Sequence, residues 1–156
     1  MYFSDIERKL TALHDRKMVV PYFAPGFSMS TSAIRKILRH ENYRMDSFID
    51  YVFSLGLYLT INTYVIISMK ELSYVLVKTR EKKGFLQKDI LAMIQNEYPS
   101  FTASRIASIE KGRNVQRKTF LAYCSALQGI CKDNPYDWAL CVGSNSHLTD
   151  KDLENL

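Results

Sequence analysis

Apolar residues recur along most of the chain with the 3.6-residue period of amphipathic helices. In residues 5–17, for example, Ile6, Leu10 and Leu13 fall on one helical face. Capping residues, glycines and prolines divide the rest of this pattern into separate segments. The further helices are expected at residues 28–39, 46–55, 68–83, 88–98, 102–112, 118–127 and 135–142. Residues 143–156 are polar, and we expect either a loose tail or a weak final turn there.

Two segments interrupt the helical pattern. Pro21 and Pro25 leave room for only a short or distorted helix between the first two helices. Residues 57–67 are rich in β-branched and aromatic residues that alternate at period two, which predicts strands. Either a hairpin turns at Asn62-Thr63, or one extended strand runs through. An apolar hairpin is marginal alone, so we expect it to pack on a helix or on the same strand of a second chain, forming a homodimer.

Residues 102–112 form the most informative segment of the chain. Thr102 is a suitable helix cap, Gly112 ends the pattern, and Ile106 and Ile109 share one face. The opposite face carries short polar groups and one long cation: Ala103, Ser104, Arg105 and Ser108. A DNA recognition helix typically packs by one face and exposes a polar face. We therefore interpret residues 102–112 as a DNA recognition helix.

The chain also contains an internal repeat. Ile34 and Ile106 stand 72 positions apart in similar local sequences. The same offset aligns Ser47, Phe48, Tyr51 and Leu55 with Thr119, Phe120, Tyr123 and Leu127. Upstream, residues 15–17 align with residues 81–83 at an offset of 66, so the second copy has a net insertion before its recognition helix. We interpret the chain as two related domains.

Composition and charge agree with a folded, mildly basic protein. The 156 residues fit one domain or two small ones, and 47% of them are hydrophobic. The net charge of +5 is compatible with a solvated surface as well as with a nucleic-acid site. Residues 69–143 carry +5, against +2 for residues 1–68 and −2 for residues 144–156. We therefore expect the stronger DNA contact in the second half.

Cysteine usage and hydropathy favour a cytoplasmic location, associated with the nucleoid when the protein is bound to DNA. Cys124, Cys131 and Cys141 are odd in number and lack paired metal-type spacing, so reduced thiols are expected. The first residues lack the basic-then-apolar pattern of a signal peptide. The most apolar run, residues 55–69, is too short and too interrupted to span a bilayer, and we expect no membrane partner.

Enzyme chemistry has no positive signal in the sequence. His14, His40 and His147 are scattered, without carboxylates or cysteines at ligand spacing. Gly-rich phosphate loops and nucleophile elbows are absent from the sequence. Cys124 falls on the inward face of its helix and is interpreted as a core residue. We therefore expect no catalytic residue, metal or cofactor.

The second half, residues 70–142, resembles the Cro/repressor-type helix-turn-helix family, often called the XRE family. Three segments carry the resemblance: Thr-Arg-Glu-Lys-Lys-Gly-Phe-Leu-Gln-Lys-Asp-Ile at 79–90, Ile-Ala-Ser-Ile-Glu-Lys-Gly at 106–112 and Lys-Thr-Phe-Leu-Ala-Tyr-Cys-Ser-Ala-Leu at 118–127. Residues 30–61 resemble the same family more distantly. The resemblance implies a mainly α fold of two tandem lambda-repressor-like helix-turn-helix domains, with a short strand or hairpin between them.

The chain departs from the family pattern at several positions. Leu86 stands where the family usually caps its second helix with Ser or Thr, and the segment after that helix is longer than usual. In the first half, Pro21 replaces the family's glutamine and His40 its glycine. Whether the first domain contacts DNA is therefore left open, and we expect it to keep a dimerising role.

The resemblance also implies site residues. The base-reading positions are Ala103, Ser104, Arg105 and Ser108 in the second half, with Thr31, Ser32 and Lys36 in the first. The positions near the DNA backbone are Gln87, Lys88, Thr102, Lys111, Arg113, Asn114, Ser30, Arg35, Arg39 and Arg44. In phage repressors the positions of Arg80 and Glu110 form a partly buried ion pair that holds the first helix to the third.

The sequence thus predicts a divergent helix-turn-helix domain at 1–56, a β-rich linker at 57–68, a Cro/repressor-type domain at 69–143 and a polar tail at 144–156. The expected function is sequence-specific binding of double-stranded DNA by a transcriptional regulator, as a homodimer joined through the 57–67 strand region. The alternative is a protein-interaction module with weak DNA binding, either an antitoxin-type autorepressor with a toxin partner or an adaptor that contacts RNA polymerase.

Overall fold

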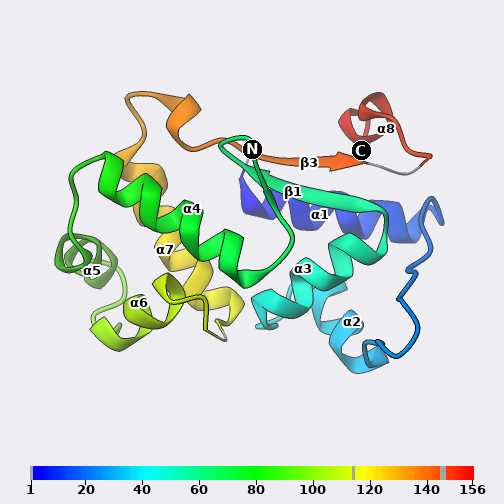
Figure 1. Ribbon diagram of the computed structural model, residues 1–156, viewed down its shortest axis with the longest axis horizontal. Coiled ribbons are helices and arrows are strands. Elements are labelled where there is room, and N and C mark those ends of the chain that lie inside the picture. Colours follow the sequence, from blue (N-terminus) through cyan, green and yellow to red (C-terminus); the bar gives the residue numbers. More distant parts are fainter. Residues whose placement is uncertain (1, 114, 145–146) are drawn as a thin grey trace.

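The computed structural model describes residues 2–113, 115–144 and 147–156, and there the chain is mainly helical with one three-stranded antiparallel sheet (Figure 1). The α-helices are α1 (Phe3–Asp15), α2 (Thr31–Leu38), α3 (Met45–Ser54), α4 (Met69–Lys82), α5 (Gln87–Gln95), α6 (Ala103–Glu110), α7 (Arg117–Ile130) and α8 (Asp150–Glu154). The strands are β1 (Leu57–Ile61), β2 (Tyr64–Ile66) and β3 (Leu140–Ser144), and a 3₁₀ turn, η1 (Pro135–Asp137), precedes β3.

The helices of the first half follow the apolar pattern. Ile6, Leu10 and Leu13 of α1 are buried, as the period predicts. α2 begins directly after Ser30, whose hydroxyl accepts a hydrogen bond from the backbone N–H of Ala33 at 3.1 Å. The chain between α1 and α2 forms no helix, because its prolines cannot donate backbone hydrogen bonds.

The hairpin is the correct one of the two alternatives for residues 57–67. β1 and β2 pair antiparallel, with Leu59 opposite Ile66. The turn residues Asn62 and Thr63 have φ values of 51° and 71°, the left-handed pair that a two-residue hairpin turn requires. Alternate residues of β1 are buried beneath the sheet.

The helix predicted at residues 135–142 is wrong. Only η1 is helical there, and β3 pairs along the whole of β1, on the edge opposite β2. The turn residue Asn62 directs this pairing. Its side-chain amide donates to the carbonyl of Asp137 at 2.8 Å and accepts from the N–H of Ala139 at 2.7 Å. The partner strand is about eighty positions away, so local periodicity carried no sign of it.

The polar tail contains a short helix, in line with the second alternative for residues 143–156. Thr149 caps α8 by accepting the backbone N–H of Asp152 at 3.1 Å. Leu148 and Leu153 are buried, and the ammonium group of Lys9 on α1 donates to the carbonyl of Leu153. The tail therefore packs against α1 and β3.

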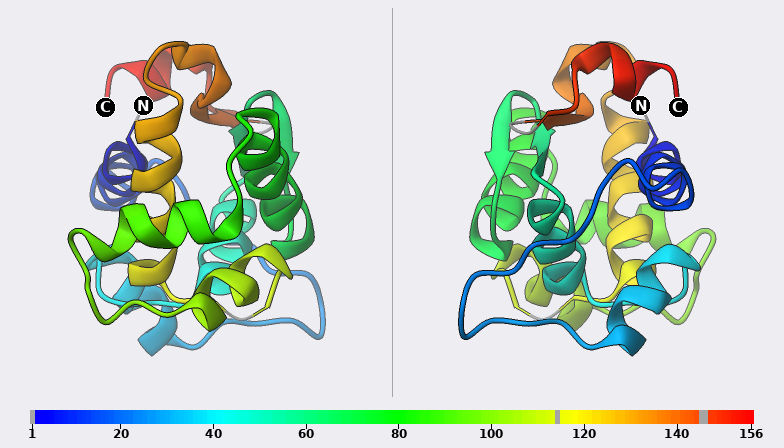
Figure 2. Two further views of the ribbon diagram at one scale, coloured as in Figure 1. Left: turned by 90° about the vertical axis from the view of Figure 1, so that its left-hand side faces the viewer. Right: turned by 90° about the vertical axis from the view of Figure 1, so that its right-hand side faces the viewer.

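The two halves share one hydrophobic core. The ring of Phe3 lies 5.0 Å from the ring of Phe48 in the first half and 5.0 Å from that of Phe120 in the second. The sheet covers one side of the molecule, and α2 and α6 lie on the opposite side in all views (Figure 1, Figure 2). No helix among the described residues combines the length and apolar character needed to cross a membrane.

Candidate nucleic-acid interface

Helix α6 is anchored by one face and exposes the other. Ile106 and Ile109 are buried, and Ser104 and Arg105 are exposed, as the sequence pattern predicts. Ser108 is half-buried one turn further along. The outward side of α6 therefore offers two hydroxyl groups and a guanidinium group.

Thr102 occupies the N-cap position of α6 but does not cap it with its side chain. Its hydroxyl instead lies 3.0 Å from the hydroxyl of Ser104. The expectation of a side-chain cap is therefore wrong. The backbone N–H of Arg105 donates to the carbonyl of Thr102 at 3.2 Å, so the N–H groups of the first two helical residues are those left to an external acceptor such as a phosphate.

A buried ion pair fixes the far end of α6. The guanidinium of Arg80 on α4 donates to both carboxylate oxygens of Glu110, at 2.7 and 3.0 Å, and also to the carbonyl of Phe85 at 2.8 Å. The two charged side chains are only 9% and 5% exposed. Tyr123 on α7 donates its hydroxyl to the same carboxylate at 2.9 Å. One carboxylate thus joins α4, α6 and α7 and sets the orientation of α6.

Helix α5 begins without the usual hydroxyl cap. Leu86 occupies the N-cap position, and Asp89 compensates by accepting the backbone N–H of Leu86 at 2.8 Å. Gln87 donates its side-chain amide to Glu110 at 3.2 Å and is exposed, as is Lys88. The extra residues before α6 are held by Gln95, whose side chain donates to the carbonyl of Phe101 at 2.9 Å.

A polar groove of about 560 Å³ runs along α6. We call it the α6 groove, and its lining residues are Asn42, Ser104, Arg105, Ser108, Val115, Gln116, Lys118 and Thr119. Three of the four predicted base-reading residues of the second half line it, and Ala103 is exposed beside them. Arg105 also leans toward the ring of Phe101, with 5.5 Å between its guanidinium carbon and the ring centroid.

Sequence reasoning missed the other wall of this groove. The side chain of Asn42 donates to Gln116 at 2.6 Å and accepts the backbone N–H of Lys118 at 3.1 Å. Asn42 belongs to the first half and its two partners to the second. Only the internal repeat, which aligns the segments after α2 and α6, could have pointed to this contact.

The predicted residues of the first half lie around α2. Thr31, Ser32 and Lys36 are exposed, and so are the predicted backbone contacts Ser30, Arg35 and Arg39. Arg44 is also exposed, but it forms an ion pair with Asp46 at 2.6 Å. Part of its charge is therefore already neutralised.

The cations after α6 lie in its C-terminal turn. Lys111 and Arg113 are exposed on either side of Gly112, which has a φ of 67°. The predicted contact Asn114 lies outside the described residues. The structure thus brings Ser104, Arg105 and Ser108 together along one groove. It places α2, which carries the predicted base-reading residues of the first half, apart from α6 on the same side of the molecule (Figure 1).

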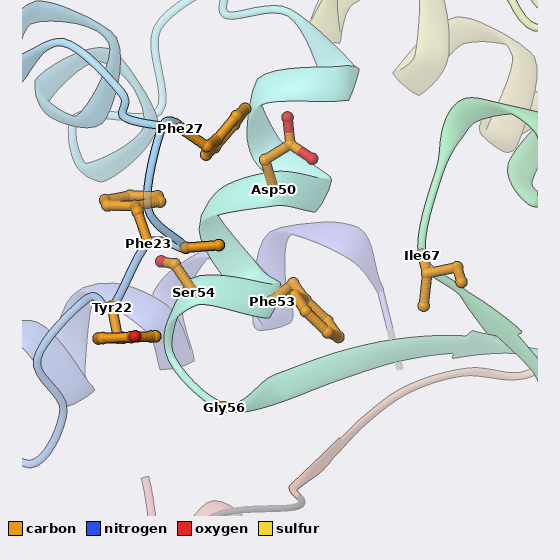
Figure 3. Close-up of a pocket in the computed structure, with 9 residues that line it drawn as sticks. Tyr22, Phe23, Phe27, Asp50, Phe53, Ser54, Gly56 and Ile67 are labelled. Carbon is orange, nitrogen blue, oxygen red and sulfur yellow. The ribbon is translucent and has the colours of Figure 1, made fainter.

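A second depression is apolar and lies beside α3. It has a volume of about 520 Å³ and takes its aromatic walls from residues 22–27 and from α3 (Figure 3). Phe27, Phe53 and Ile67 are about half exposed, and Tyr22 is mostly exposed. Burial, followed by the nearby charge of Asp46, raises the pKa of Asp50 at its rim. We call this depression the aromatic pocket.

Potential reactive groups are buried or isolated in the described part of the chain. Burial raises the pKa of the Cys124 thiol well above its ordinary value, which opposes formation of a thiolate. Groups of three or more His, Cys, Asp or Glu residues that could hold a metal ion do not occur among the described residues.

Two buried tyrosines are expected to make the fold sensitive to alkali. Burial and then the neighbouring carboxylate raise the pKa of Tyr123 beside Glu110 and of Tyr43 beside Glu7. The folded state therefore holds these protons more tightly than the unfolded chain, whose tyrosines titrate near pH 10. Stability is complete below pH 10 and falls above it, by about 1.4 kcal/mol per pH unit for each tyrosine.

This expectation is checked by urea unfolding at pH 8, 10 and 11. Replacing Tyr123 with Phe should reduce the slope of the unfolding free energy against pH above pH 10, whereas replacing the exposed Tyr22 with Phe should leave it unchanged. Equal slopes for Tyr123→Phe and the parent chain would show that Tyr123 titrates normally in the folded state.

Comparisons with protein-family models, with curated proteins and with solved structures found no match to this chain.

Proposed function

We propose that this protein binds double-stranded DNA in a sequence-specific manner and acts as a transcriptional regulator. The single observation that carries the proposal is the α6 groove, where Ser104, Arg105 and Ser108 line one wall. Together with α4, α5 and α7, α6 forms the second-half domain that resembles the XRE family, and we propose α2 as part of a divergent first domain of the same kind.

The chemistry of the groove suits base edges in a major groove. A guanidinium group donates two parallel hydrogen bonds to the O6 and N7 atoms of guanine, and serine hydroxyls pair with several bases. Lys118 lines the groove, Lys111 and Arg113 follow the C-terminal end of α6, and all three cations are exposed and suit phosphates. The ion pair of Arg80 and Glu110 holds α6 rigidly, which favours a fixed docking geometry.

The homodimer predicted from the sequence is not part of this proposal. It rested on an apolar strand in need of a partner, and β1 has β2 on one edge and β3 on the other. The pairing that we expected from a second copy is thus supplied within the chain.

Replacement of Arg105 by alanine tests the proposal directly. The change should weaken binding to the DNA site selected by the parent chain by about 1–3 kcal/mol, or roughly 5–150-fold, and should relax the preference at one base pair. Binding is measured by fluorescence anisotropy at fixed salt, and base preference by selection from random duplexes. Equal affinity and an unchanged selected sequence would contradict a base-reading role for Arg105.

Lys151 supplies the matched control for that experiment. It is an exposed cation on α8, on the sheet side of the molecule, away from α6 (Figure 1). Lys151→Ala removes the same unit of charge, so it should change affinity much less than Arg105→Ala. A similar loss in both variants would mean that overall charge, and not a base contact, determines binding.

The aromatic pocket favours a second candidate function, a protein-interaction module with weak DNA binding. Phe27, Phe53 and Ile67 expose apolar surface of the kind found at protein interfaces. In that case binding to DNA would be independent of sequence and would disappear by physiological salt, and a protein partner would be sought next.

A further inference from the structure

The two halves of the chain repeat each other in structure as well as in sequence. α2 and α6 each have eight residues and begin 72 positions apart, and α3 and α7 begin at the same offset. Helices α1 and α4 begin 66 positions apart, at Phe3 and Met69. Burial follows the same offset of 72, because Tyr51 and Tyr123 are both fully buried.

Equivalent positions of the two halves meet at the centre of the molecule. Arg44 forms an antiparallel bridge with Gln116, which is its own equivalent at the offset of 72. The backbone N–H of Met45 donates to the carbonyl of Val115 at 2.8 Å. In the reciprocal bond, the N–H of Arg117 donates to the carbonyl of Tyr43, also at 2.8 Å. Contacts in which each residue meets its own equivalent are those of a two-fold axis.

The sheet provides a second contact, between strands that correspond in their order along the chain although β3 lies beyond the offset of 72. β1 follows α3, the last helix of the first half, and β3 follows α7, the corresponding helix of the second. The two strands pair antiparallel along five residues each, centred on Leu59 and Val142. An antiparallel pair of equivalent strands is what rotation by a half turn gives, whereas simple translation would leave the strands parallel.

This symmetry determines how the two outward helices are presented. An axis through the Arg44–Gln116 contact and the middle of the β1–β3 pair relates α2 to α6, and both helices lie on the side of the molecule opposite the sheet (Figure 2). Helices related in this way address the two strands of a duplex in opposite directions. In two-fold symmetric DNA-binding proteins, this arrangement matches an inverted pair of half-sites.

We propose that a single chain reads two half-sites in inverted orientation, α6 contacting one and α2 the other. This inference rests on the proposed function. The half-sites differ in sequence because the helix faces differ: Ala33 stands at the position of Arg105, and Lys36 at the position of Ser108. The described residues 16–30, between α1 and α2, form no equivalent of α5, so α2 contributes less backbone contact and its half-site is bound more weakly.

The first experiment measures how many chains occupy the selected site. A duplex carrying the sequence selected from random DNA is titrated with the purified chain, and the mass of the complex is measured by light scattering. The proposal predicts one chain per duplex, with protection of both half-sites in footprints. Two chains on one inverted site, or protection of one half-site only, would overturn the inference while leaving sequence-specific binding intact.

The second experiment makes the two helix faces alike. The variant Ala33→Arg with Lys36→Ser gives α2 the side chains of α6 at these two positions, of which Lys36 is exposed and Ala33 is half-buried. Selection should then return a more symmetric inverted repeat, with the weaker half-site changed toward the stronger. Lys151→Ala serves as the control and should leave the selected sequence unchanged. An unchanged weaker half-site in the double variant would show that α2 does not read bases.

The two proposals fail in different ways. Absence of any selected sequence would contradict the proposed function itself. If the selected sequence changes with Arg105→Ala but not with the α2 substitutions, the proposed function stands and the inference that one chain binds two half-sites is contradicted.

Discussion

Replacing Arg80 with alanine is expected to lower the free energy of unfolding by about 3–5 kcal/mol. The carboxylate of Glu110 would then lie among α4, α6 and α7 without its charge partner, and its side chain is only 5% exposed. The hydroxyl of Tyr123 and the amide of Gln87 would remain as neutral donors, which cannot replace a bidentate guanidinium. The measurement is equilibrium unfolding in urea, followed by circular dichroism.

The exposed pair of Lys78 and Glu81 is the matched control for this change. Its charged atoms lie 3.8 Å apart and both side chains are more than half exposed. Glu81→Ala should therefore cost less than about 1 kcal/mol. A loss from Arg80→Ala that is no larger than that from Glu81→Ala would contradict a stabilising role for the buried pair.

Replacing Arg117 with alanine, at the junction of the two halves, is expected to lower the free energy of unfolding by a similar amount, about 3–5 kcal/mol. Its guanidinium donates to both carboxylate oxygens of Glu7 on α1, at 2.8 and 2.9 Å. The Glu7 side chain is only 1% exposed, and Tyr43 donates its hydroxyl to the same carboxylate at 2.9 Å. Removal of Arg117 would leave a fully buried charge unpaired.

Replacing Glu7, the partner of Arg117 in this ion pair, should lower the free energy of unfolding by less. Glu7→Gln keeps an acceptor for Tyr43 and leaves Arg117, whose side chain is 21% exposed, with access to water. Urea unfolding of both variants measures this asymmetry. An equal or larger loss from Glu7→Gln would show that the stability does not depend on compensating the buried carboxylate of Glu7.

The parts of this fold that were predictable are those with local causes. The positions of most helices follow from apolar periodicity. The hairpin turn at Asn62-Thr63, one of two alternatives for that segment, follows from turn chemistry. The pair of Arg80 and Glu110, which the structure contains, was expected from the resemblance and not from spacing alone.

The parts that were missed depend on residues far apart in the chain. β3 is a strand because the free edge of β1 accepts it, and Leu140 and Val142 carry no strand signal of their own strong enough to show this. The contact of Glu7 with Arg117 spans 110 positions, and that of Asn42 with Gln116 spans 74. Such contacts depend on how the two halves pack together. The internal repeat indicates that there are two halves but not how one is oriented against the other.

The residues of the candidate site also divide into a part that was predicted from local sequence and a part that was missed. The outward residues of α6 were identified from helical spacing, since a helix buried by Ile106 and Ile109 must expose Ser104 and Arg105. The opposite wall of the α6 groove was not identified, because Asn42 and Lys118 come from different halves.

Selection of bound sequences from random duplex DNA, followed by footprinting over a series of salt concentrations, tests the central claim most directly. Sequence-specific regulation by α6 and α2 predicts one discrete motif with two unequal, inverted half-sites, still bound at physiological salt. Binding that is indifferent to sequence and is lost by physiological salt would contradict it.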